Sequence, residues 1–337
     1  MTTPPRVLHA PIDIANQPAL SAYGLREIGI QAHCFAALHP LRYEQSPDIV
    51  APAGRLPFLR AAAGAVRSHD VLHLHYGQSL VRGAIDARLA RRLGRRIVVE
   101  FHGSDVRMPS VERERNPHYV WLEGEDDAVA TGRMRRWSAI TDGHAIQCDH
   151  SLDRFLDPWF PHVHVVGHRI DTRRFAPAYP NPAARRPVVV HSPSTIAAKG
   201  TPIVRAAVAA LQADGVPLEY VEVHGVAHAQ AQALYRRADL VIDQLCSGSH
   251  GVFAVEAMSL GKPVVCYVLP ELVPTFPPDL PLILATPDTL AGVLADWLAR
   301  PADLAERGRA SRAYAEREHD CRVVAQRLLD VYEQLPR

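Results

Sequence analysis

The sequence has almost no lysine. Of its 37 basic residues only Lys199 and Lys262 are lysine, and all the others are arginine. Arginine and lysine replace each other at many exposed positions, but not where a site needs a compact ammonium group. Each of the two lysines is therefore a candidate for a specific chemical role.

A strong net charge and long apolar runs are missing as well. The 37 basic and 36 acidic residues leave a formal charge of +1, whereas a nucleic-acid-binding protein usually carries a large basic excess. No stretch approaches the roughly 18 consecutive apolar residues of a membrane span, and the residues after Met1 lack a signal-peptide pattern. We expect neither a nucleic-acid partner nor a transmembrane segment.

Cysteines are few, odd in number and widely scattered, with no Cys-x-x-Cys pair. They are Cys34, Cys148, Cys246, Cys266 and Cys321. This pattern is typical of reduced thiols rather than of a disulfide framework or a zinc site. It predicts a soluble cytoplasmic protein, and 337 residues at roughly 150 residues per domain predict two domains.

Short apolar segments alternate with amphipathic helical patterns along the chain. In the first half the expected strands are 6–10, 32–36, 71–75 and 96–101, with weaker ones at 145–148 and 163–166. A proline-rich break at 177–187 separates this half from a second series that starts with a strand at 188–191. The alternation predicts two consecutive doubly wound α/β domains, 1–178 and 186–319, with the ligand at the carboxyl ends of the strands in the cleft between them.

The segment 247–265 carries the strongest motif. A glycine-containing loop follows a strand, and a helix is expected to begin near Gly251 and to end at Gly261. Unpaired amides in the first turn, together with the helix dipole, make an anion site. Glu256 lies about one and a half turns into the helix, where its carboxylate can accept hydrogen bonds from hydroxyl groups. Taken alone, the segment is a strand-turn-helix corner of a kind found in many α/β proteins.

This segment resembles the signature of family 4-type retaining glycosyltransferases of the GT-B fold. In that signature an acid, seven other residues and a second acid precede Ala-Met-x-x-Gly-x-Pro-Val, and the run from Glu256 to Val265 reproduces its second half. Further segments follow in the order of the family: 70–75, 101–105, 170–177, 198–201 and 233–242. The resemblance spans the chain from about Asp70 to its C-terminus.

The resemblance implies two Rossmann-like domains facing across a cleft, with a C-terminal helix within 320–337 that crosses back to the N-terminal domain. Apolar positions at helical spacing, among them Val324, Leu328 and Tyr332, agree with a helix that packs on a core. The implied activity transfers a hexose from a UDP- or GDP-linked donor to a hydroxyl group. The compact length and the lack of a membrane-binding helix favour a small soluble acceptor, such as a natural product or an amino sugar, and leave a lipid-linked or cell-envelope acceptor open. Configuration would be retained, without metal or another cofactor, in a monomer or homodimer.

The resemblance also assigns roles to residues. Lys199 would neutralise the departing diphosphate, and His102 would contact the donor sugar. The full donor set is Ser194, Lys199, Gly225, His250, Gly251, Val252, Phe253 and Glu256. The acceptor set is Gln17, His75, Asp105 and Arg107.

Three departures from the family pattern leave other functions open. Gly248 stands where the family has its first acid, Ser194 stands where relatives carry an arginine, and residues 12–18 replace a glycine-rich loop. A nucleotide-sugar-binding pseudoenzyme that works through a partner is one alternative. A sugar-nucleotide epimerase of the same fold is another.

Overall fold

The computed structural model describes residues 4–38, 45–120 and 126–336, and the chain divides into two compact units. Unit 1 comprises Met1–Pro109, Gly124–Asp171 and Asp320–Arg337, and unit 2 comprises Ser110–Glu123 and Thr172–His319. Each unit is described by itself below.

Unit 1 contains a seven-stranded parallel sheet in the order β3-β2-β1-β4-β5-β6-β7. Its strands are β1 (Val7–Ala10), β2 (Ala32–Ala36), β3 (Ile49–Val50), β4 (Val71–His75), β5 (Arg96–Glu100), β6 (His144–Gln147) and β7 (His162–Val165). Its helices are α1 (Gln17–Glu27), α2 (Arg55–Ser68), α3 (Ile85–Arg92), α5 (Asp127–Ile140), α6 (Asp153–Leu156) and α12 (Cys321–Gln334).

Unit 2 contains a five-stranded parallel sheet in the order β12-β11-β10-β8-β9. Its strands are β8 (Val188–His191), β9 (Glu219–Glu222), β10 (Leu240–Ile242), β11 (Val264–Cys266) and β12 (Ile283–Leu284). Its main helices are α7 (Thr201–Ala213), α8 (His228–Arg237), α9 (Val252–Ser259), α10 (Leu290–Leu298) and α11 (Pro301–Glu318).

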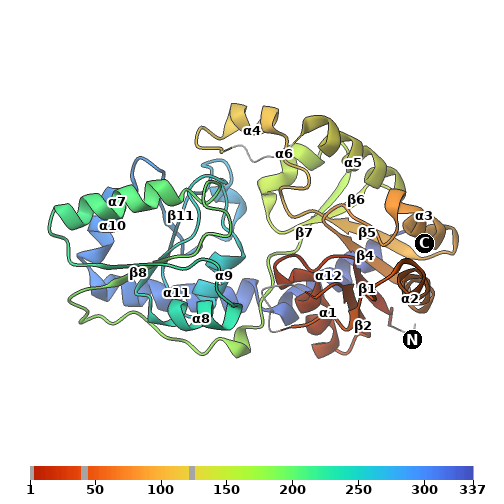
Figure 1. Ribbon diagram of the computed structural model, residues 1–337, viewed down its shortest axis with the longest axis horizontal. Coiled ribbons are helices and arrows are strands. Elements are labelled where there is room, and N and C mark those ends of the chain that lie inside the picture. Colours follow the sequence, from red (N-terminus) through yellow and green to blue (C-terminus); the bar gives the residue numbers. More distant parts are fainter. Residues whose placement is uncertain (1–3, 39–44, 121–125, 337) are drawn as a thin grey trace. The chain divides into compact units, whose positions relative to one another are not determined.

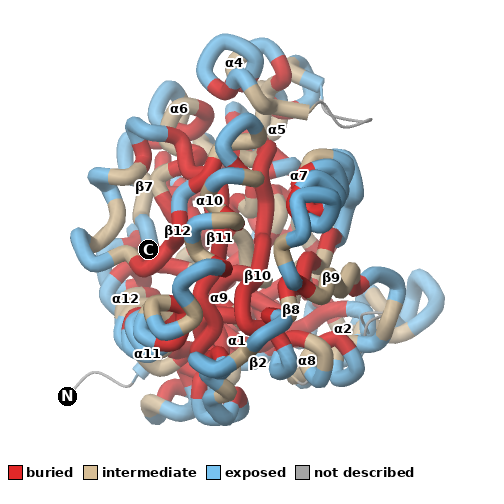
Figure 2. The backbone as a smooth tube through the Cα atoms, turned by 90° about the vertical axis from the view of Figure 1, so that its left-hand side faces the viewer, coloured by how far each residue is buried: buried red, intermediate tan, exposed pale blue. Residues whose placement is uncertain are grey.

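Helices cover both faces of each sheet (Figure 1). The central strands β10 and β11 are buried along their whole length, whereas exposed residues lie on helices such as α7 (Figure 2). Strand order reverses between β1 and β4 in unit 1 and between β8 and β10 in unit 2. Crevices at the carboxyl ends of strands beside such a reversal are where doubly wound folds bind ligands. Among the described residues, no helix combines the length and hydropathy of a membrane span.

All of the strands named from the sequence pattern are present, with shifts of one or two residues. The helix expected from residue 80 to 93 begins only at Ile85, because Gly83 (φ 76°) and Ala84 (φ 57°) adopt left-handed backbone conformations. Such conformations interrupt a right-handed helix.

The sequence expectation placed all of 1–178 in the first domain, but residues 110–120 and 172–178 group with unit 2. After helix α4 (Pro109–Arg115), Asn116 and His118 contact unit 2. The Asn116 side-chain amide donates to the Cys246 carbonyl at 2.8 Å, and the His118 ring meets Tyr267 edge-on at 5.0 Å. These long-range contacts leave no local signal in the sequence.

The C-terminal helix returns to unit 1, as predicted. Val324, Leu328 and Tyr332 of α12 are buried in the core that also contains Ala19 and Leu25 of α1. The two helices approach closely at Gly24, where a Cβ atom would lie 2.2 Å from the Cys321 carbonyl oxygen.

We predict that Gly24→Ala destabilises unit 1 by about 1–3 kcal/mol, because the added methyl group would overpack the contact between α1 and α12. Gly64→Ala is the matched control, since a Cβ at Gly64 of α2 meets nothing within 4 Å. Relief of the helix penalty of glycine should stabilise that variant by about 0.5–1 kcal/mol. Urea titration measures the free energy of unfolding of both variants. Equal effects of the two substitutions would refute the close packing of α1 against α12.

Candidate active site

In unit 2 the ammonium group of Lys199 lies at the reversal of strand order. Lys199 precedes α7, whose N-cap Gly200 is in the left-handed conformation (φ 74°). Its Nζ donates to Asp243 Oδ1 at 3.2 Å and to Gln244 Oε1 at 2.6 Å, directly after β10. The Lys199 side chain is 14% exposed, whereas Asp243 is fully buried. The cation is thus held in place while part of it stays accessible.

Asp243 also connects this ammonium to the first turn of α9. Its Oδ2 accepts a hydrogen bond from the Gly251 amide at 2.7 Å, and a Cβ at Gly251 would lie 3.1 Å from Lys199 Nζ. Glycine at 251 therefore allows the close approach of the ammonium. Because Asp243 occupies the Gly251 amide, the amides of Val252 and Phe253 are the first-turn donors left for an anion.

Glu256 is paired with His228, a residue that the sequence reading missed. His228 Nε2 lies 2.8 Å from Glu256 Oε1, and both side chains are slightly exposed. His228 is the first residue of α8. Nothing in the sequence distinguishes it from the other 17 histidines, because the contact depends on how α8 and α9 pack on one sheet.

The glycine at 248 is a requirement of the fold. Gly248 has φ 77°, and a Cβ there would lie 2.8 Å from Leu269 Cγ. The acid of the family signature therefore cannot be accommodated at this position unless Leu269 moves.

The other predicted donor residues of unit 2 differ in exposure. Ser194 and Gly225 are exposed in the loops after β8 and β9. His250 is buried, with ring contacts to Phe276 at 5.5 Å and to His319 at 5.6 Å. Contact of His250 with the donor stays a prediction.

In unit 1 the candidate residue His102 stands in a turn after β5. The amides of His102 and Gly103 donate to Asp105 Oδ1 at 3.0 and 2.8 Å. Asp105 is buried, and burial raises its pKa to about 6. Its carboxylate oxygen Oδ1 thus holds the turn that contains His102, and contact of Asp105 with an acceptor stays a prediction.

Two further residues expected to bind the acceptor are interior. Gln17 exchanges hydrogen bonds with the backbone of Arg169, donating to its carbonyl at 3.0 Å and accepting from its amide at 2.9 Å. His75 is fully buried beneath His102 and contacts it at 3.2 Å between Nδ1 and Nε2. Of the four residues expected to bind the acceptor, only Arg107 is partly exposed.

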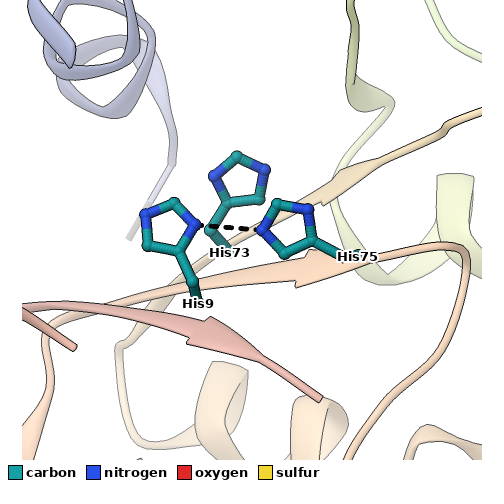
Figure 3. Close-up of side chains that lie close together, drawn as sticks. All are labelled: His9, His73 and His75. Carbon is teal, nitrogen blue, oxygen red and sulfur yellow. Dashed lines mark hydrogen bonds between the residues drawn. The ribbon is translucent and has the colours of Figure 1, made fainter. Parts of the chain in front are cut away.

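The pairing of the strands places a cluster of buried polar side chains next to His102. His9 of β1 pairs with His73 of β4, and His75 of β4 pairs with Glu100 of β5. Paired residues of parallel strands project from the same face of a sheet. Figure 3 shows the imidazole rings of His9, His73 and His75 side by side on one face, with the hydrogen bond between His9 and His75.

A buried ion pair supplies the charge of this cluster. Arg169 Nη1 donates to Glu100 Oε1 at 2.7 Å, and Nη2 donates to Oε2. Burial alone would raise the pKa of Glu100, but the guanidinium of Arg169 holds it well below its usual range. The surrounding imidazoles are neutral at pH 7, since burial lowers the pKa of His9, His73 and His75 and brings that of His102 to about 4.

Nitrogen atoms of His9, His73 and His75 lie within 4.8 Å of one another, as three metal ligands do. Hydrogen bonds already engage several of these atoms. His73 Nδ1 lies 2.8 Å from the Tyr332 hydroxyl, and His9 Nδ1 lies 3.0 Å from His75 Nε2. That the protein needs no metal stays a prediction.

Comparison with solved structures finds GT-B glycosyltransferases. No family model matches the sequence, and no curated protein does. Sucrose-phosphate synthase from Thermosynechococcus elongatus aligns with a TM-score of 0.66 at 16% identity, over 98% of this chain and 99% of that one. HepE from Anabaena, solved with UDP-glucose, gives 0.65 at 16% identity, over 98% and 100%. The catalytic domain of starch synthase IV from Arabidopsis thaliana, bound to ADP and acarbose, gives 0.61 at 14% identity, over 98% and 99%. The chain has the GT-B fold.

We predict that unit 1 loses stability between pH 7.5 and pH 5.5. Histidines whose pKa is lowered in the folded state bind fewer protons there than in the unfolded state, where the pKa is about 6.5, so acid favours unfolding. The four buried histidines together should therefore lower the free energy of unfolding as the pH falls through this range. Asp105, with its raised pKa, offsets part of this loss. Urea titration at several pH values measures how the free energy of unfolding changes with pH. A free energy that does not change over this range would contradict the neutral state of the cluster.

Proposed function

We propose that this chain is a glycosyltransferase that moves a hexose from a UDP- or GDP-linked sugar to a hydroxyl of a small soluble acceptor, such as a natural product or an amino sugar, with retention of configuration. The observation that carries the proposal is the position of Lys199 beside the first turn of α9, at the reversal of strand order in unit 2. A fixed cation and unpaired helix amides at one point are what a diphosphate leaving group requires.

In the proposed reaction the donor is bound by unit 2. Lys199 and the amides of Val252 and Phe253 hold the diphosphate, and Glu256, oriented by His228, accepts hydrogen bonds from the ribose hydroxyls. Structures of fold neighbours solved with UDP-glucose and with ADP support a nucleotide-linked donor. The scattered cysteines favour a reducing, cytoplasmic location.

The chemical step breaks the bond between the anomeric carbon and the phosphate oxygen and forms a bond from that carbon to the acceptor oxygen. We assign the acceptor proton to the leaving phosphate, whose negative charge grows as the bond breaks. Lys199 stabilises this charge more in the transition state than in the ground state, which is the condition for catalysis. The step requires no metal. His102 of unit 1 is assigned to a hydroxyl of the transferred sugar.

A second candidate is a nucleotide-sugar-binding pseudoenzyme. Gly248 favours it, since the backbone and Leu269 leave no room for the acid that relatives of this signature carry there. Tight donor binding without release of the nucleoside diphosphate, whatever the acceptor, would support this function over transfer.

We predict that one nucleoside diphosphate among UDP, GDP, dTDP, ADP and CDP stabilises the protein, by about 2.7 kcal/mol at a hundred times its dissociation constant. Lys199→Ala should lose most of this effect, because it removes the cation from the phosphate site. Arg205→Ala, a change of an exposed cation on the neighbouring helix α7, is the matched control. A thermal-shift assay measures all three proteins. Equal stabilisation of Lys199→Ala and wild type would overturn the role of Lys199.

A second prediction separates the ribose contact from the phosphate contact. Glu256→Ala should weaken binding of the active nucleoside diphosphate by about 10-fold or more, the effect of losing a hydrogen bond to a charged group, but leave the affinity for inorganic pyrophosphate unchanged. Lys199→Ala should weaken both ligands. Calorimetric titration provides the affinities, and a loss of pyrophosphate binding in Glu256→Ala would contradict the assignment.

A further inference from the structure

Arginine is concentrated in one stretch of unit 1. Residues 51–96 contain nine arginines and two aspartates, a formal charge of +7, whereas the whole chain carries +1. Helix α2, within this stretch, has no acidic residue. The one acid of α3, Asp86, is buried and accepts hydrogen bonds from the amides of Leu80 and Val81. The exposed side of each helix is therefore basic and carries no carboxylate.

The topology of the sheet brings these two helices together. Helix α2 connects β3 to β4 and α3 connects β4 to β5, and both connections run in the same direction across the sheet. Right-handed crossovers that run in one direction lie on one face of a sheet, and α2 and α3 contact each other. We call the exposed residues of 55–68 and 82–93 the α2–α3 surface.

Most arginines of this surface have no acidic partner. Within the part of the chain that the structure describes, no ion pair or side-chain hydrogen bond is formed by the exposed Arg55, Arg60, Arg67, Arg82, Arg88 and Arg92. The acids beside the two helices are already paired, Asp70 with Arg6 and Arg95, and Asp142 with Arg91. The positive charge of the surface is thus available to a partner.

The same surface exposes aliphatic side chains. Leu56 is 68% exposed, Ile85 61% and Leu89 53%, and Leu59 and Leu93 are exposed as well. Residues four apart lie on one side of a helix, so Ile85, Leu89 and Leu93 follow one line along α3, with Arg88 and Arg92 beside it. A single exposed leucine needs no explanation. Five aliphatic residues on adjoining helices, among unpaired arginines, indicate an interaction surface.

We propose that the α2–α3 surface docks this protein on an anionic lipid bilayer. The aliphatic side chains enter the boundary between headgroups and acyl chains, as those of amphipathic interfacial helices do. The arginines bind the lipid phosphates, because a guanidinium donates two parallel hydrogen bonds to phosphate oxygens while its apolar stem stays among the acyl chains. Sequence pattern alone did not predict a membrane-binding helix, since the exposure of Ile85 and Leu89 depends on which side of α3 packs on the sheet.

The composition of the surface favours a bilayer over two other partners. A single-stranded nucleic acid would bind the arginines, but such sites add aromatic side chains that stack on bases, and the exposed apolar residues here are all aliphatic. A second copy of the chain, docked through the same surface, would place unpaired arginines against one another, because a twofold interface is self-complementary. An anionic bilayer complements both the charge and the apolar side chains.

The test is co-sedimentation of the whole chain with vesicles, without nucleotide. Vesicles of equal parts phosphatidylglycerol and phosphatidylcholine are compared with vesicles of phosphatidylcholine alone. We expect binding to the anionic vesicles that weakens with added salt, and binding to the neutral vesicles that is weaker by roughly tenfold or more. No binding to the anionic vesicles, or equal binding to both kinds, would overturn the proposal.

Two double variants separate the charged contribution from the apolar one. Arg88→Gln with Arg92→Gln should weaken binding to the anionic vesicles by roughly fivefold for each arginine removed. Ile85→Gln with Leu89→Gln should weaken it by about tenfold or more, because two apolar side chains no longer enter the bilayer. All four residues are exposed and glutamine is a good helix former, so both variants should fold, which circular dichroism verifies.

The matched control is Arg205→Gln with Arg237→Gln in unit 2, where each exposed arginine is paired with a glutamate. It removes the same number of positive charges from other surfaces and should bind the vesicles as the wild type does. Equal weakening in the control, or wild-type binding by Ile85→Gln with Leu89→Gln, would refute the role of the α2–α3 surface.

Two further measurements distinguish the other partners. Binding of a mixed-sequence single-stranded DNA without binding of vesicles would assign the surface to nucleic acid and overturn the proposal. A dimer in solution that both double variants abolish, again without binding of vesicles, would assign it to a second copy and overturn the proposal as well. The surface contains none of the residues assigned to the donor or the acceptor, so these results are independent of the proposed function.

Discussion

The ion pair between Arg169 and Glu100 is the interaction on which the N-terminal unit depends. Arg169 lies after β7, Glu100 ends β5, and the guanidinium also donates to Ser21 of α1 at 2.7 Å through Nε. Two strands and a helix are therefore tied together by one buried group. Removal of either partner would leave an unpaired buried charge, which typically costs about 3–5 kcal/mol.

In unit 2 a single buried carboxylate connects the elements around the candidate site. Asp243 alone joins Lys199 to the amide of Gly251, and both contacts lie at the carboxyl ends of neighbouring strands. In unit 2 a buried carboxylate at the reversal of strand order thus holds the group that we assign to the diphosphate. The second lysine, Lys262, has a structural role. Lys262 is buried and donates to the carbonyl oxygens of Ala178 and Arg236, and burial lowers its pKa to about 8.

The fold could be predicted from the sequence because its signals are local. Runs such as Val71–His75 alternate with amphipathic segments, and proline and glycine mark the ends of elements. The C-terminal helix was predictable from its apolar face and from the resemblance. The assignment of residues 110–120 to the second unit was not, because it depends on side-chain contacts such as that of Asn116, which have no sequence pattern.

The site could be predicted only in part. Motifs identify Lys199, His102 and Glu256, the last of them within helix α9, whereas His228 belongs to no motif. His75, at a strand end, and Gln17, in the segment 12–18, were expected to bind the acceptor, yet both are buried. Their partners, Tyr332 and Arg169, are distant in sequence, so only strand register and helix packing reveal them.

Sugar transfer is measured most directly by the release of nucleoside diphosphate from nucleotide sugars by the purified protein with a panel of small hydroxylated acceptors. We predict acceptor-dependent release from one donor, with strong loss in both His102→Ala and Lys199→Ala. Donor binding with no release for any acceptor would contradict it and would identify the protein as a binding module of the same fold.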